Sequence, residues 1–81
     1  MEGESMPYVD IKCFPRTEEM RKDLVEKINQ LLIDAWGVPQ EAVSISLEEV
    51  TPEDWDEQVK VPEMDARDDT MYILHGQKRF E

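Results

Sequence analysis

The sequence predicts an α+β fold built on one β-α-β unit with two parallel strands. Apolar and polar residues alternate over residues 8–13, a helical period follows over 17–36, and a second alternation covers 42–50. A full helix between two strands excludes a hairpin, so the strands are expected to run parallel with a right-handed crossover.

The first alternation predicts a strand with one apolar and one polar face. The apolar set is Val9, Ile11 and Cys13, and the polar set is Tyr8, Asp10 and Lys12. Phe14 and Pro15 end the strand, because proline has no N–H to donate to a neighbouring strand.

The helix has a clear start and a clear end. Thr17 is a suitable N-cap, and Glu18 and Glu19 are acidic residues in the first turn. Gly37 can adopt the left-handed C-cap conformation, and Pro39 prevents the helix from continuing. One apolar stripe is expected along the helix, made of Met20, Leu24, Ile28, Leu31, Leu32 and Ala35.

The second half of the chain gives weaker signals. The second strand would direct Val43, Ile45 and Leu47 to one face. Residues 51–55 then resemble a capped helical turn, 59–62 an extended piece and 64–70 a charged loop. A short β-prone run over 71–74 precedes a turn at His75 and Gly76 and a charged tail.

This unit is too small to close its own sheet. Two strands leave both outer edges open, and one helix covers only one face. A two-fold dimer would give a four-stranded sheet with two helices on one face, so we expect a homo-oligomer, with a dimer favoured and a hexamer possible.

Composition excludes several classes of partner. The chain has 81 residues and a formal net charge of -11, which opposes binding to nucleic acid and to anionic membranes. An anionic substrate would therefore need local positive charge. No motif indicates a cofactor or a metal, and no signal peptide or membrane span is recognisable, so we expect a cytoplasmic protein.

Residues 6–12, MPYVDIK, together with IKCFPR, SISL and PEDW, resemble the 4-oxalocrotonate tautomerase family. They are closest to its dimeric bacterial branch, which tautomerises phenylenolpyruvate-like compounds. The resemblance covers roughly residues 7–64. The acidic, pattern-free residues at the start predict a disordered leader over 1–6, and the resemblance implies a single tautomerase-like domain over 7–81, with a C-terminal tail from about residue 65.

The resemblance also implies a cofactor-independent keto-enol tautomerase of small 2-hydroxy or 2-keto unsaturated carboxylic acids. Pro7 matches the catalytic proline, whose free amine would act as general base once Pro7 is the mature N-terminus. Arg16 matches an arginine that binds the substrate carboxylate, and Trp55 matches an aromatic wall of the pocket.

Two features depart from the family pattern. The founding enzymes carry a second arginine where this chain has Ser44, so monocarboxylates with a large apolar group are expected to be preferred over dicarboxylates. The leader would leave the Pro7 nitrogen as an amide without useful basicity. The alternative is thus a non-catalytic homologue with a masked proline that acts as an acidic protein-interaction module.

Overall fold

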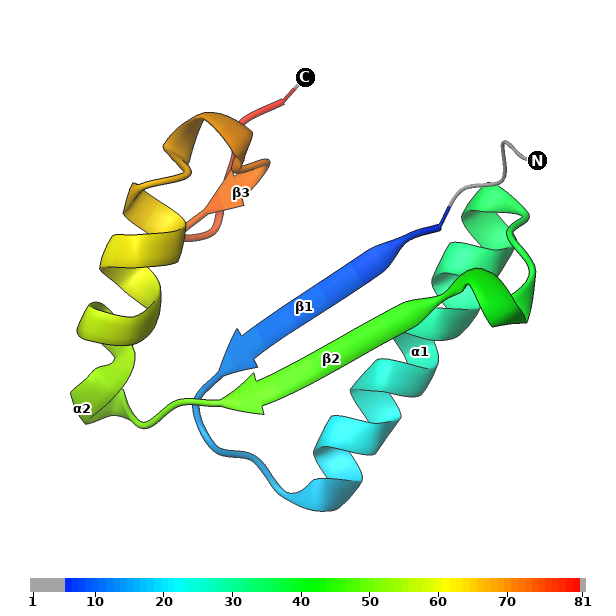
Figure 1. Cartoon of the computed structure of the whole chain (residues 1–81), viewed down its shortest axis with the longest axis horizontal. Helices are drawn as coiled ribbons and strands as arrows, with labels where there is room; N and C mark the ends of the chain where they lie inside the picture. Colours follow the sequence, from blue (N-terminus) through cyan, green and yellow to red (C-terminus); the bar gives the residue numbers. More distant parts are fainter. Residues whose placement is uncertain (1–5, 81) are drawn as a thin grey trace. The chain divides into compact units, whose positions relative to one another are not determined.

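The computed structural model describes residues 6–80, which form two compact units divided after Glu49. Each unit is described by itself. The strand-helix unit, up to Glu49, contains β1 (Tyr8–Cys13), α1 (Glu18–Trp36), η1 (Gln40–Ala42) and β2 (Ser44–Glu49) (Figure 1). The C-terminal unit contains α2 (Pro52–Trp55), η2 (Asp56–Asp65), η3 (Asp68–Thr70), β3 (Ile73–Leu74) and β4 (Gln77–Lys78).

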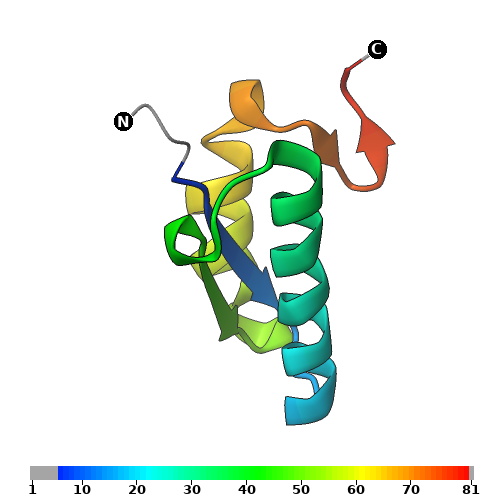
Figure 2. The same ribbon diagram turned by 90° about the vertical axis from the view of Figure 1, so that its right-hand side faces the viewer.

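The predicted β-α-β core is confirmed. β1 and β2 pair in parallel, with Tyr8 opposite Ser44 at one end and Cys13 opposite Glu49 at the other. Helix α1 connects the strands and lies along one face of this two-stranded sheet (Figures 1 and 2). The single domain expected over 7–81 stays a prediction, and the part of the leader over 1–5 lies outside the described residues.

Helix α1 is capped as the sequence indicates. The Thr17 hydroxyl accepts the backbone N–H of Met20 at 3.2 Å, which satisfies one of the free donors of the first turn. Gly37 adopts φ 68° and donates its N–H to the carbonyl of Ile33 at 2.8 Å.

The apolar stripe of α1 is wider than the sheet can cover. Ile28 and Leu32 are half-buried, as expected of residues that face the strands. Met20, Leu24 and Leu31, which we call the α1 stripe, are 55%, 43% and 64% exposed. Ala35 is exposed as well, so the sheet covers only part of the predicted apolar stripe, because two strands are too narrow to reach all of it.

Helical structure in the C-terminal unit extends further than the sequence indicated. The extended piece expected over 59–62 is wrong, since wide helical turns run through η2 and include Pro62. The Ala66 N–H donates to the Val61 carbonyl at 3.2 Å, an i to i+5 bond, and Val59 is a buried anchor of this helix. Such wide turns accommodate a proline because they differ from the α-helical ladder that proline breaks.

A small hairpin follows. β3 and β4 pair antiparallel across a turn in which His75 has φ 51° and Gly76 has φ 80°. Two consecutive positive φ values are characteristic of tight hairpin turns. The expected turn and β-prone run are confirmed, and part of the charged tail forms the second strand.

Candidate active site

Pro7 lies directly before β1, at the edge of the strand-helix unit. It is half-buried, and its carbonyl accepts the backbone N–H of Ser44 at 3.2 Å, so the sheet fixes its backbone. Met6, the residue before it, is 77% exposed. With Met6 attached, the Pro7 nitrogen is an amide. Loss of the residues up to Met6 would leave an amine at a position that the sheet already holds in place.

Arg16 lies beyond the other end of the same strand. Eight residues separate it from Pro7, and the six of them that form β1 span roughly 17 Å at about 3.3 Å per residue. The two side chains are therefore not brought together within one copy of the chain. No ion pair among residues 6–80 involves the Arg16 guanidinium, so this group is available to an anion.

The backbone of Arg16 has a partner that the sequence did not indicate. Its N–H donates to Glu49 Oε2 at 2.8 Å, and the same carboxylate oxygen lies 3.3 Å from Arg21 Nε. Glu49 ends β2, opposite Cys13 at the end of β1. The loop that carries Arg16 is thus tied to the sheet as well as to the helix.

Trp55 belongs to the C-terminal unit. It ends α2, which starts at Pro52 after the N-cap residue Thr51, and its side chain is half-buried. Pro7 and Arg16 belong to the strand-helix unit. A role for Trp55 as a pocket wall beside them therefore stays a prediction.

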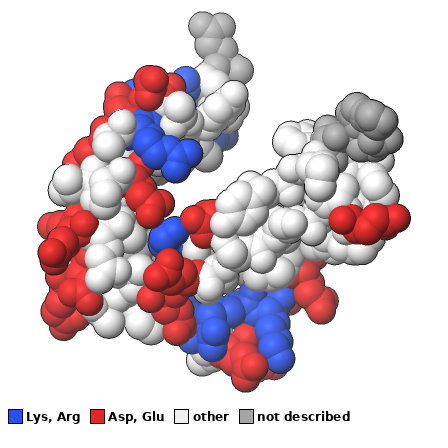
Figure 3. Space-filling view, viewed as in Figure 1, with Lys and Arg blue, Asp and Glu red and all other residues white. Residues whose placement is uncertain are grey.

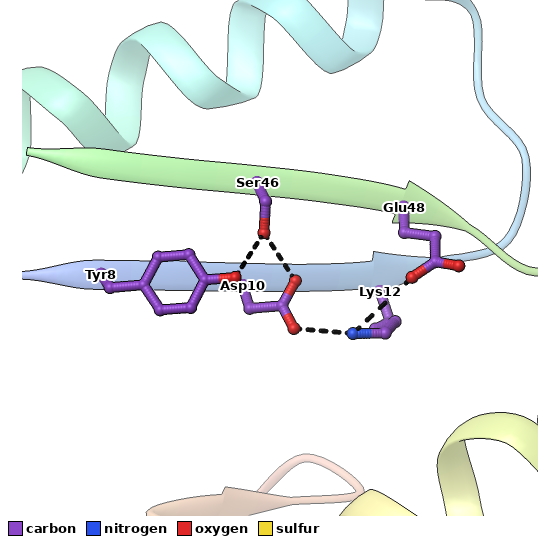
Figure 4. A network of polar contacts seen from close by, with 5 residues as sticks. All are labelled: Tyr8, Asp10, Lys12, Ser46 and Glu48. Atoms are coloured by element: carbon purple, nitrogen blue, oxygen red, sulfur yellow. Dashed lines mark hydrogen bonds and ion pairs between the residues drawn. The ribbon is translucent and has the colours of Figure 1, made fainter.

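Five polar side chains form a network on the sheet face opposite α1 (Figure 4). Ser46 Oγ donates to Asp10 Oδ1 at 2.7 Å and therefore accepts from the Tyr8 hydroxyl at 3.0 Å, because a serine has a single hydroxyl hydrogen. Lys12 Nζ lies 2.6 Å from Asp10 Oδ2 and 3.8 Å from Glu48 Oε1. The alternation of the strands predicted this face, but their register decides which residues pair.

Basic side chains gather near the start of α1, and Arg21, Lys22 and Lys27 among them are paired with carboxylates. Five of the nine basic residues lie in the strand-helix unit, namely Lys12, Arg16, Arg21, Lys22 and Lys27. Figure 3 shows Lys and Arg over α1 and the loop before it, whereas Asp and Glu cover much of the helical segment of the C-terminal unit. Arg16, whose guanidinium forms no ion pair within residues 6–80, is therefore the basic group of this unit that could bind a carboxylate.

Within residues 6–80 no group of three His, Cys, Asp or Glu side chains is arranged to hold a metal ion. Helices of the length and apolarity needed to cross a membrane do not occur in the described part of the chain.

Comparison with known proteins decides the family. The model of the tautomerase enzyme family matches residues 7–65, so the match begins at Pro7. The chain belongs to the tautomerase family. This family membership places it among isomerases, and it favours an enzyme over the non-catalytic interaction module.

Individual relatives agree with this assignment. Tautomerase PptA from Klebsiella pneumoniae subsp. pneumoniae is 44% identical over 52 residues, which are 62% of this tautomerase and 69% of the relative. Tautomerase PptA from Enterobacter sp. is 41% identical over 56 residues, covering 67% and 74% of the two chains. The crystal structure of YwhB, a homologue of 4-oxalocrotonate tautomerase, aligns with a TM-score of 0.53 and 33% identity, over 56% of this chain and 75% of that one.

Proposed function

We propose that this protein is a cofactor-independent keto-enol tautomerase of small 2-hydroxy or 2-keto unsaturated carboxylic acids, with Pro7 as its general base. The observation that carries the proposal is that the family match starts at Pro7, the residue that directly precedes β1. Removal of the preceding residues would turn the Pro7 nitrogen into a secondary amine. That amine could take a proton from the enol and return it to carbon.

The amine must be neutral to act as a base near pH 7. Burial in an apolar pocket and a nearby cation both disfavour its protonated form and lower its pKa. The half-buried position of Pro7 supports the first effect, and Trp55 would exclude water from the pocket. Arg16 would bind the substrate carboxylate through two parallel hydrogen bonds.

A second copy of the chain would complete this site. Pro7 and Arg16 lie beyond opposite ends of β1, and antiparallel pairing of two copies would bring the start of one strand to the end of the other. Such a dimer would also cover an open strand edge and the exposed α1 stripe. We therefore propose a two-fold dimer with a four-stranded sheet and two helices on one face, working in the cytoplasm.

The residue at position 44 favours a particular substrate. Ser44 stands where the founding enzymes of the family carry a second arginine, so one cation fewer is available for a dicarboxylate. Phenylenolpyruvate, a monocarboxylate with an aromatic ring, fits this arrangement better than 4-oxalocrotonate.

Two forms of the protein test the proposal. One is expressed from Met1, and the other from Met6 so that removal of the initiator methionine exposes Pro7. Intact mass identifies the N-terminus of each form, and ketonisation of phenylenolpyruvate measures activity. We expect activity in the form that starts at Pro7 and little in the form that keeps residues 1–6.

A Pro7→Ala variant of the shorter form is the matched control, because it keeps a free N-terminal amine but loses the pyrrolidine ring. If the shorter form with an intact Pro7 is no more active than this control, proline does not act as the base. Retention of residues 1–6 in the protein from its own cells would also contradict the proposed mechanism.

A further inference from the structure

The carboxylate of Glu49 connects the end of β2 to the residues around the start of α1. Its Oε2 atom accepts the Arg16 N–H at 2.8 Å and lies 3.3 Å from Arg21 Nε. The Nε atom of Arg21 is shielded from solvent and forms no aligned hydrogen bond among the described residues, so the carboxylate acts on it as an ion-pair partner. About a third of each side chain is exposed, 32% for Glu49 and 36% for Arg21.

Arg16 and Arg21 lie on either side of the first turn of α1. With Thr17 as N-cap, Arg16 is the residue before the cap and Arg21 is the fourth residue of the helix. In many helices a hydrophobic contact between these two positions fixes the angle at which the chain enters the helix. Here one carboxylate from β2 bridges the two positions instead.

We propose that Glu49 is a positioning residue for Arg16, a step that rests on the proposed binding of the substrate carboxylate by Arg16. Without the Glu49 contact, the backbone of Arg16 would lose the hydrogen bond that holds it to the end of β2. Ordering of the loop would then have to occur when the substrate binds, and this ordering weakens binding. With the contact in place, the guanidinium projects from a backbone that is already fixed.

Glu48, the preceding residue of β2, provides a matched control. It carries the same charge on the same strand, but it faces the polar network and lies 3.8 Å from Lys12 Nζ. Removal of its carboxylate changes the net charge as much as removal of the Glu49 carboxylate does, and it leaves the Arg16 loop untouched.

Binding of phenylpyruvate, the keto form of the proposed substrate, tests this inference without requiring catalysis. The dissociation constant is measured by NMR titration for the form that starts at Pro7. We expect Glu49→Ala to weaken binding roughly 3- to 10-fold, the effect of one additional group that must be ordered on binding. Glu49→Gln should lose less, because its amide oxygen still accepts the Arg16 N–H, and Glu48→Ala should bind as the parent does.

The same variants in an Arg16→Ala background separate positioning from a general structural role. If Glu49 acts through Arg16, Glu49→Ala should change nothing further once the Arg16 side chain is absent. An equal loss in both backgrounds, unchanged binding by Glu49→Ala, or no binding of phenylpyruvate to the parent would each overturn the proposal. If circular dichroism shows that Glu49→Ala is unfolded, Glu49→Gln and the Arg16→Ala, Glu49→Gln double variant supply the comparison.

Failure of the proposed catalysis gives a different pattern. A parent protein that binds phenylpyruvate with the expected dependence on Glu49, yet does not ketonise phenylenolpyruvate, supports the positioning role and rejects Pro7 as the base. Activity together with binding that is independent of Glu49 rejects the positioning role alone.

Discussion

Replacement of Leu31 by glutamine should dissociate the proposed dimer while it leaves each copy folded. Leu31 belongs to the α1 stripe and is 64% exposed. Full burial of a leucine side chain is worth about 1.5–3 kcal/mol, so covering the exposed part contributes about 1–2 kcal/mol per copy. A two-fold interface contains the residue twice, which gives roughly 2–4 kcal/mol per dimer.

This free energy corresponds to a large change in the dissociation constant. Because about 1.4 kcal/mol corresponds to a tenfold change in a dissociation constant, Leu31→Gln should raise the dissociation constant of the dimer roughly 30- to 700-fold. Analytical ultracentrifugation over a range of protein concentrations measures it. Circular dichroism should show a helix content like that of the parent, because a polar replacement at an exposed helix position changes stability by only about 0.5 kcal/mol.

Gln30→Ala is the control for this experiment, because Gln30 is an exposed α1 residue outside the stripe and its side chain bonds to Asp34 at 2.9 Å. The parent and this control should dissociate alike. A Leu31→Gln constant within about threefold of the parent value, or a parent that stays monomeric at high concentration, would show that the α1 stripe is not buried between two copies.

Two further predictions concern local structure. Gly37→Ala should lower the free energy of unfolding by about 1 kcal/mol, because residue 37 has a φ of 68°, a backbone conformation that is unfavourable for alanine. A Cβ at this position would meet no atom within 4 Å, so a steric clash adds nothing to this cost. Urea titration measures the change, and an unchanged midpoint would contradict the prediction. The Arg79 guanidinium bonds to Asp68 at 2.6 and 2.9 Å, and this hydrogen bonding lowers the pKa of that carboxyl below its usual value. Because the folded pKa is the lower one, the contribution of this pair is present above the unfolded pKa and is lost as the pH falls through the folded value. NMR shifts of β3 and β4 should therefore change below about pH 4, and Asp68→Asn should remove this titration, whereas a persistent titration would point to another group.

Local signals in the sequence predicted the strand-helix unit well. Thr17 and Gly37 mark the ends of α1 through bonds that span four residues or fewer, so the sequence around each end is sufficient to recognise it. The alternation over each strand likewise predicts the two strands, since the periodicity of side chains along a strand does not depend on the rest of the chain, and the helix between them predicts the parallel pairing.

Features that depend on distant residues could not be predicted in the same way. The bond between Glu49 and the Arg16 backbone joins residues 33 positions apart, and only the register of β1 and β2 selects Glu49 rather than Glu48. The helical turns of η2 pass through Pro62, a residue that locally indicates the end of a helix. The exposure of the α1 stripe reflects the width of the sheet, a property of the assembled unit.

Because Pro7 and Arg16 lie beyond opposite ends of β1, dimers that combine two different inactive variants should regain activity. Subunits with Pro7→Ala and subunits with Arg16→Ala would each be inert alone. After the two populations are combined and exchange partners, each hybrid would unite one intact proline with one intact arginine, and turnover would reappear. Complementation of this kind occurs only when each active site contains residues from both subunits.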